Sequence, residues 1–141
     1  MELNAIDKSI EYFGKIQTLI DEKIGRSLRA RARALPGMME SVGLIPTLSF
    51  CYGKAKKETY NEILKRWPNN PIEVKEEEGG YAIYLLLSLL YLRDLGIIDD
   101  EEMKDPIKAF KKLLTKGAIA TRLLMPYVVE IKRLAEAVYG E

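Results

Sequence analysis

The sequence predicts an all-α protein: a single-domain bundle of six or seven helices, several of them kinked by proline. Apolar residues recur at steps of three and four, which is the spacing of one helix face. No segment shows the alternation of apolar and polar residues that is typical of a half-buried strand. The 141 residues are 48% hydrophobic and 30% charged, which suits one folded domain with its own core. We therefore expect one domain over residues 1–141.

The first expected helix reaches about Gly25, which could end or bend it. Its apolar face is formed by Ile6, Ile10, Phe13, Ile16, Ile20 and Ile24. The helical pattern continues from Arg26, and we expect a kink or a restart at Pro36. Proline lacks the backbone donor of a helix interior and disfavours helical geometry in the residue before it.

Gly43 is expected to cap the C-terminal end of that stretch, and Pro46 suits the first turn of a third helix. This helix should extend to about Lys57, and a short helix from Glu58 to Trp67 should follow it. Residues 68–80 contain two prolines, an acidic run and a Gly-Gly pair. We expect a mobile loop there, because such residues mark loops rather than helix interiors.

The apolar run from Tyr81 to Leu92, broken only by Ser88, predicts a helix buried on most sides. It is shorter than the roughly 20 residues that span a bilayer, so no membrane contact is expected. Asp99 or Asp100 can cap the following stretch. A helix should begin at Pro106 and continue through Leu114, and the last helix should run from 118 to about 139 with a bend at Pro126.

The composition excludes several enzyme classes. The chain has no histidine, which removes histidine acid–base catalysis and most zinc sites. The single cysteine, Cys51, lies in an apolar stretch and is interpreted as a small buried hydrophobic residue. A lone cysteine forms no disulfide within the chain, and the N-terminus lacks the pattern of a signal peptide. We therefore expect a cytoplasmic protein with no catalytic residues and no cofactor.

An acidic stretch offers the one candidate for a metal site. Glu101, Glu102 and Asp105 have an EExxD spacing that resembles half of the magnesium site of all-α nucleotide pyrophosphohydrolases. Such a site needs further oxygen ligands from a second acidic pair, and the chain offers no ExxD partner. The acids also precede Pro106 at a helix start, where they favour the helix dipole. We expect no metal site.

Basic residues gather in blocks, although the net charge is only +1. Arg26, Arg29 and Arg33 share one helical stripe, and guanidinium groups suit phosphate recognition. Lysines follow at Lys54, Lys56 and Lys57, and a basic pair stands at Lys132 and Arg133. Acids concentrate in residues 73–78 and 94–105. Such segregation permits binding of a polyanion or head-to-tail contact between copies, and a solvated face with ion pairs is the structural alternative.

The segment Arg29–Phe50 resembles the small all-helical subunit of the Cmr complex, the type III-B CRISPR effector. The resemblance consists of an Arg/Ala-rich helix, Leu35-Pro36, an apolar stretch, Gly43-Leu44, the turn Thr47-Leu48-Ser49-Phe50 and Lys54, with the basic pair Lys132-Arg133 in the last helix. Small subunits of type III-A and type I effectors share this helical character and stay open as alternatives.

The resemblance implies a non-catalytic subunit whose partners are the other Cmr subunits, copies of itself, crRNA and target RNA. Copies would stack in a minor filament along the paired RNA, while cleavage belongs to other subunits. The RNA-binding candidates are Arg26, Arg29, Arg33, Lys54, Lys56, Lys57, Lys132 and Arg133. A helical interaction adaptor without nucleic-acid contact is the alternative function, and it predicts that the arginines pair with acids.

Overall fold

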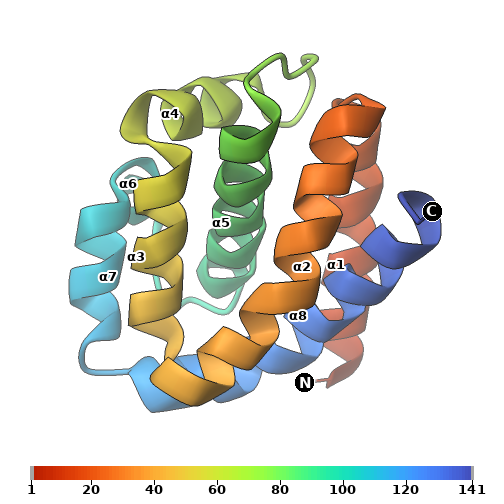
Figure 1. Ribbon diagram of the computed structural model, residues 1–141. Coiled ribbons are helices and arrows are strands. Elements are labelled where there is room, and N and C mark those ends of the chain that lie inside the picture. The colour runs from red at the N-terminus through yellow and green to blue at the C-terminus, as the bar shows by residue number, and fades with distance from the viewer. Residues whose placement is uncertain (1, 141) are drawn as a thin grey trace.

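The computed structural model describes residues 2–140, and these form eight α-helices rather than the expected six or seven (Figure 1). The helices are α1 (Glu2–Gln17), α2 (Glu22–Val42), α3 (Leu44–Ala55), α4 (Lys57–Arg66), α5 (Glu76–Asp94), α6 (Asp100–Lys104), α7 (Pro106–Leu113) and α8 (Gly117–Val138). No strand occurs within these residues. The all-α prediction is confirmed, but the predicted number of helices was too low.

Helix α5 is the centre of the bundle, as the apolar run predicted. Every residue from Gly79 to Leu92 is buried, so this stretch of the helix has no solvent face. Helices α2, α3, α4 and α8 pack around it, and Figure 1 shows it between α3 and α2. Across the described residues, none of the helices is long and apolar enough to cross a membrane.

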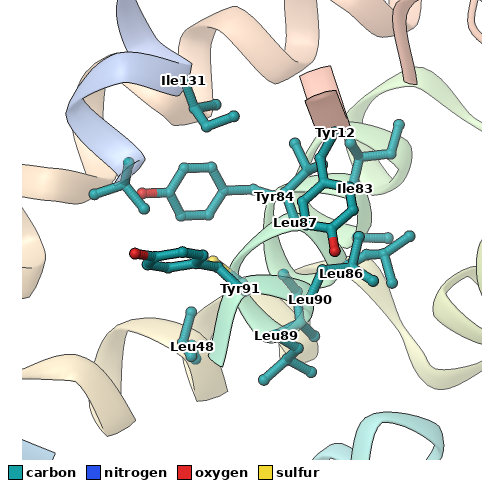
Figure 2. Packing of buried hydrophobic residues seen from close by; sticks show 14 of the residues in the cluster. Tyr12, Leu48, Ile83, Tyr84, Leu86, Leu87, Leu89, Leu90, Tyr91 and Ile131 are labelled. Atoms are coloured by element: carbon teal, nitrogen blue, oxygen red, sulfur yellow. The ribbon is translucent and has the colours of Figure 1, made fainter. Parts of the chain in front are cut away.

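Tyrosines fill much of the core. Tyr84 and Tyr91 project from α5 among buried aliphatic side chains (Figure 2). The ring of Tyr91 stacks on that of Tyr127 from α8, with centroids 4.5 Å apart and planes 2° from parallel. The Tyr127 hydroxyl donates to the Leu87 carbonyl oxygen at 2.7 Å. Because this hydrogen bond satisfies the buried hydroxyl, α8 is fixed on α5 by both stacking and a polar contact.

Glycine allows α2 and α5 to approach closely. A Cβ atom on Gly80 would collide with the Ser27 hydroxyl and would lie 2.8 Å from the Ser27 carbonyl carbon. Gly80 therefore belongs to a helix contact, and not to the mobile loop expected over 68–80.

That connection is shorter than expected, because α5 already begins at Glu76. The acidic run 76–78 forms its first turn, where negative charge favours the helix dipole. Residues 67–75 connect α4 to α5, and the Ile72 amide donates to the Leu19 carbonyl oxygen at 2.8 Å. Mobility of this shorter segment stays a prediction.

The N-terminal boundaries differ from the expected ones. Helix α1 ends at Gln17, and Asp21 caps α2 by accepting a hydrogen bond from the Ile24 amide at 2.9 Å. Ile24 thus belongs to α2, although its spacing continues that of α1. Of the kink or restart expected at Pro36, the restart is wrong, since α2 continues to Val42, and the kink stays a prediction. Buried residues on both sides of Pro36 hold the helix on the core and outweigh one lost backbone hydrogen bond.

Other helix ends lie where the sequence placed them. Gly43 ends α2 with φ at 94°, and its amide donates to the Met39 carbonyl oxygen at 2.9 Å. Asp99 forms a capping box with Glu102 at the start of α6. Pro106 opens α7, and Pro126 lies inside α8.

Candidate nucleic-acid interface

The arginine stripe lies on α2 and is partly neutralised by acids. Arg26 Nε lies 3.5 Å from Glu22 Oε2 one turn earlier, and Arg33 Nε lies 3.2 Å from Glu136 Oε2 of α8. The Arg26 and Arg33 side chains are 65% and 52% exposed. Exposed ion pairs contribute about 0–1 kcal/mol, so both guanidinium groups can exchange partners at little cost.

Arg29, the middle residue of the stripe, is more enclosed. Its side chain is half-buried, and its Nε atom is buried without a hydrogen-bond partner among the described residues. A buried donor without a partner is costly. Arg29 is therefore less exposed than its two neighbours in the stripe, and it carries a donor that the fold leaves unsatisfied.

Arg31, which is not among the RNA-binding candidates predicted from the sequence, lies in a row of aromatic and basic side chains. Its guanidinium carbon is 4.5 Å from the centroid of the Tyr81 ring of α5. Tyr81 meets Phe50 of α3 edge to face at 5.7 Å, and Lys54 Nζ lies 5.8 Å from the Phe50 centroid. These residues come from three helices, so no spacing rule could have joined them.

The lysines of the second block lie at the junction of α3 and α4. Lys54 and Lys57 are exposed. Lys56 Nζ lies 3.2 Å from Glu78 Oε2, and the Thr59 hydroxyl donates to the same carboxylate at 2.8 Å. The Thr59 hydrogen bond and then Lys56 hold the pKa of Glu78 below its usual value. The basic block at 54–57 thus meets the acidic block at 76–78 within one chain.

The C-terminal basic pair lies on α8. Lys132 is half-buried, and Arg133 contacts Glu130 at 3.3 Å with its side chain 70% exposed. Lys132 lies one turn before Glu136, the partner of Arg33. Lys132 therefore lies on the same face of α8 as Glu136, which pairs with Arg33 of the stripe. Figure 1 places the junction of α3 and α4 across α5 from α2.

Cys51 and Glu102, which belong to the residue types that can carry catalysis or bind a metal, have structural roles here. Cys51 is buried as predicted, and burial raises the pKa of its thiol to about 12. Glu102 accepts a hydrogen bond from the Asp99 amide at 2.9 Å and lies 3.6 Å from Lys112 Nζ. Among the side chains that the structure describes, no group of three or more acidic or cysteine residues is arranged to hold a metal ion.

A family model and a curated protein that match this chain both carry the name Cmr5. The family model for "CRISPR-associated protein (Cas_Cmr5)" matches residues 8–138. The CRISPR system CMR subunit Cmr5 of Saccharolobus solfataricus is 31% identical over 139 residues, covering 92% of this chain and 89% of that protein.

Two solved structures have the same fold. A chain in the cryo-EM structure of the type III-B Cmr-beta bound to cognate target RNA and AMPPnP superposes with a TM-score of 0.87 at 23% identity, covering 98% of this chain and 97% of that one. A chain of the type III-B Cmr-beta complex bound to non-cognate target RNA gives 0.84 at 25% identity, covering 95% of each. With the family model spanning nearly every helix described above, this chain belongs to the Cas_Cmr5 family of CRISPR-associated proteins.

Proposed function

We propose that this chain is a non-catalytic small subunit of a type III-B CRISPR effector complex. It stacks with copies of itself in a minor filament and contacts crRNA and target RNA through basic patches. Its partners are the other Cmr subunits and the paired RNA, and its compartment is the cytoplasm. Family membership supports the subunit role, and the RNA contact rests on the surface chemistry of α2.

The observation that carries the RNA contact is the exposure of Arg26 and Arg33. Each guanidinium is paired only at the surface, so a phosphate can replace the carboxylate without leaving a buried charge. A planar guanidinium can also hold a phosphate through two parallel hydrogen bonds, which a lysine cannot. Lys132 lies one turn before Glu136, the partner of Arg33, and adds a positive charge to this face of α8.

The decisive experiment uses two double variants that break the same two ion pairs. Arg26→Glu/Arg33→Glu reverses two positive charges, whereas Glu22→Gln/Glu136→Gln removes only the carboxylates. In the reconstituted complex, the first variant should weaken target-RNA binding and flatten its salt dependence. Each lost phosphate contact should lower the log–log salt slope by roughly 0.7 to 0.9. The second variant should bind RNA at least as tightly as the wild type.

Circular dichroism and incorporation into the complex provide the controls, since both variants should stay helical and assemble. Normal RNA binding by the arginine variant would contradict the proposed RNA contact.

A helical adaptor without RNA contact is the second candidate. The pairing of Arg26 with Glu22 and of Arg33 with Glu136 favours it, because an adaptor would use these arginines to hold its own helices. For an adaptor, both double variants should leave RNA affinity unchanged. Both should lower the free energy of unfolding, the arginine variant more, because it brings like charges together.

A further inference from the structure

Phe50 is the one aromatic residue that the fold leaves exposed in the described part of the chain. It is 39% exposed, whereas the other phenylalanines, the tyrosines and Trp67 are buried or half-buried. A single exposed apolar side chain is ordinary at a protein surface. The neighbours of Phe50 therefore decide whether this ring can bind a ligand, and which kind.

Tyr81 of α5 holds the ring of Phe50 in place. The two rings meet at 83° with centroids 5.7 Å apart, and Tyr81 is only 8% exposed. The guanidinium carbon of Arg31, from α2, lies 4.5 Å from the centroid of the same tyrosine ring. Edge-to-face and cation–π contacts each favour particular geometries, so the buried tyrosine orients both neighbours. Helices α2, α5 and α3 thus present a cation and an exposed ring in defined positions.

The two helices that flank Tyr81 bring cations to this ring. Residues 23–39 of α2 and 44–55 of α3 contain no aspartate or glutamate. Lys54 Nζ lies 5.8 Å from the Phe50 centroid, close to the limit of about 6 Å for a cation–π contact. The lysine is exposed, so it can turn to another partner at little cost. Phe50 is therefore bordered by two side chains that suit an anionic group.

The space beside the ring is open. Gly53 follows Phe50 by three residues, so the two positions are neighbours on the surface of α3. Gly53 is exposed, and a Cβ atom there would meet nothing within 4 Å. A flat ligand can therefore approach Phe50 over Gly53 without displacing a side chain.

An unpaired nucleotide satisfies all three properties of this surface. Its base is planar and stacks on an aromatic ring, and its phosphates pair with the neighbouring cations. A base inside a duplex has both faces covered by adjacent base pairs and cannot stack in this way. An acidic protein loop would pair with Arg31 and Lys54 but would leave the ring of Phe50 in water.

We propose that Phe50 stacks on the base of an unpaired RNA nucleotide, with Arg31 and Lys54 contacting the adjoining phosphates. This inference rests on the proposed contact with RNA and adds recognition of a base that lies outside the duplex. Stacking accepts any base, because every base has a π-face. The surface therefore selects unpaired nucleotides and not a particular sequence.

Photo-cross-linking tests the contact with the unaltered chain. A 5-iodouridine that stacks on an aromatic side chain cross-links to it under long-wavelength ultraviolet light. Target RNAs carry this base at successive positions, each time either paired with the guide or mismatched to it, and are bound to the reconstituted complex. Mass spectrometry should find a cross-link to Phe50 with mismatched positions and none with paired ones. Absence of this cross-link at every position would overturn the proposal, and so would equal cross-linking of paired bases.

Variants of Phe50 separate stacking from apolar contact. Phe50→Leu keeps an apolar side chain but removes the ring, whereas Phe50→Trp keeps a stacking surface. Phe50→Leu should weaken binding of a short target RNA with one unpaired nucleotide by roughly five- to fiftyfold, and Phe50→Trp should retain it. Unchanged RNA affinity in Phe50→Leu would overturn the proposal. Failure of Phe50→Leu to enter the complex would show that another subunit covers the ring, and would overturn it too.

A second pair of variants leaves Phe50 intact. Gly53→Leu fills the open space beside the ring and should weaken RNA binding as Phe50→Leu does. Gly14→Leu is the matched control, since a Cβ at this exposed position of α1 also meets nothing within 4 Å. It should leave RNA binding unchanged, and equal binding by the two leucine variants would count against the stacking surface.

The salt dependence separates this proposal from the arginine contact. Removing the ring of Phe50 deletes no phosphate contact, so affinity should fall while the log–log salt slope stays the same. A Phe50 cross-link together with normal RNA binding by Arg26→Glu/Arg33→Glu would uphold stacking and reject the contact through the stripe. A flatter salt slope in the arginine variant without a Phe50 cross-link would do the reverse.

Discussion

Lys56 is the one residue other than glycine with a positive φ, 73°, in the described part of the chain. It joins α3 to α4, and its amide donates to the Tyr52 carbonyl oxygen at 3.0 Å. With ψ at 145°, this backbone lies outside the left-handed helical region in a conformation that is nearly restricted to glycine, and a side chain there costs roughly 1 to 3 kcal/mol. The ion pair with Glu78 offsets only a small part of this cost, because Lys56 is largely exposed. The packing of α3 and α4, rather than the ion pair, therefore fixes the backbone conformation of Lys56.

Two substitutions separate the backbone from the side chain at this position. Lys56→Ala and Lys56→Gly both remove the ion pair, but only glycine adopts the positive φ without strain. The glycine variant should be more stable than the alanine variant by about 1 kcal/mol, as measured by urea unfolding. Equal stabilities would show that the junction relaxes to another conformation.

At the scale of the helices, the contact between α2 and α5 depends on Gly80. Gly80→Ala should destabilise the fold by about 1 to 3 kcal/mol, because the new methyl group collides with Ser27. Gly37→Ala is the matched control, since a Cβ there meets nothing within 4 Å on the exposed side of α2. It should raise stability by about 0.5 to 1 kcal/mol through helix propensity. Thermal unfolding of both variants measures the difference, and a neutral Gly80→Ala would contradict the close packing.

Helix identity could be predicted from the sequence wherever local chemistry decided it. Gly43, Asp99 and Pro106 act through their own backbone or side chains, so their roles were visible. The break before α2 was hidden because the isoleucine spacing runs through it to Ile24. The continuity of α2 past Pro36 depends on tertiary packing, which no local rule contains.

In the candidate interface, too, local features could be predicted from the sequence, whereas contacts between distant parts of the chain could not. The exposure of Arg26 and Arg33 follows from the periodicity of α2 and could be expected. The pairing of Arg33 with Glu136 joins two distant parts of the chain, so spacing could not show it. The meeting of Lys56 with Glu78 likewise follows from the packing of α5 against the junction of α3 and α4.

For the whole molecule, the buried phenols make stability sensitive to alkaline pH. Burial is the largest cause that raises the pKa of Tyr60, Tyr84 and Tyr127 above the ordinary value of 10.0. The folded state therefore holds these groups protonated, while the unfolded chain releases their protons above that pH. Their contribution to stability is complete below pH 10.0 and is lost progressively as the pH rises above it.

We expect the midpoint temperature of thermal unfolding to fall as the pH rises past 10.0. Tyrosinate absorbance should appear together with the loss of the helical circular dichroism signal. Tyr127→Phe should lose about 1 kcal/mol at neutral pH with the hydrogen bond to Leu87, and should depend less steeply on alkaline pH. Tyrosinate absorbance from all the tyrosines with the helices intact would contradict this coupling.

The enclosure of α5 also determines how the molecule moves. A surface helix can fray or detach while the rest of a protein stays folded, but α5 is buried from Gly79 to Leu92 and packs against α1, α2, α3, α4, α6 and α8. Its amide hydrogens reach solvent only when the surrounding layer has come apart, so their slowest exchange with deuterium reports the opening of the entire bundle. The outer helices, by contrast, can open locally while α5 stays in place. A partner that docks on an outer helix can therefore shift that helix without disturbing the centre of the bundle.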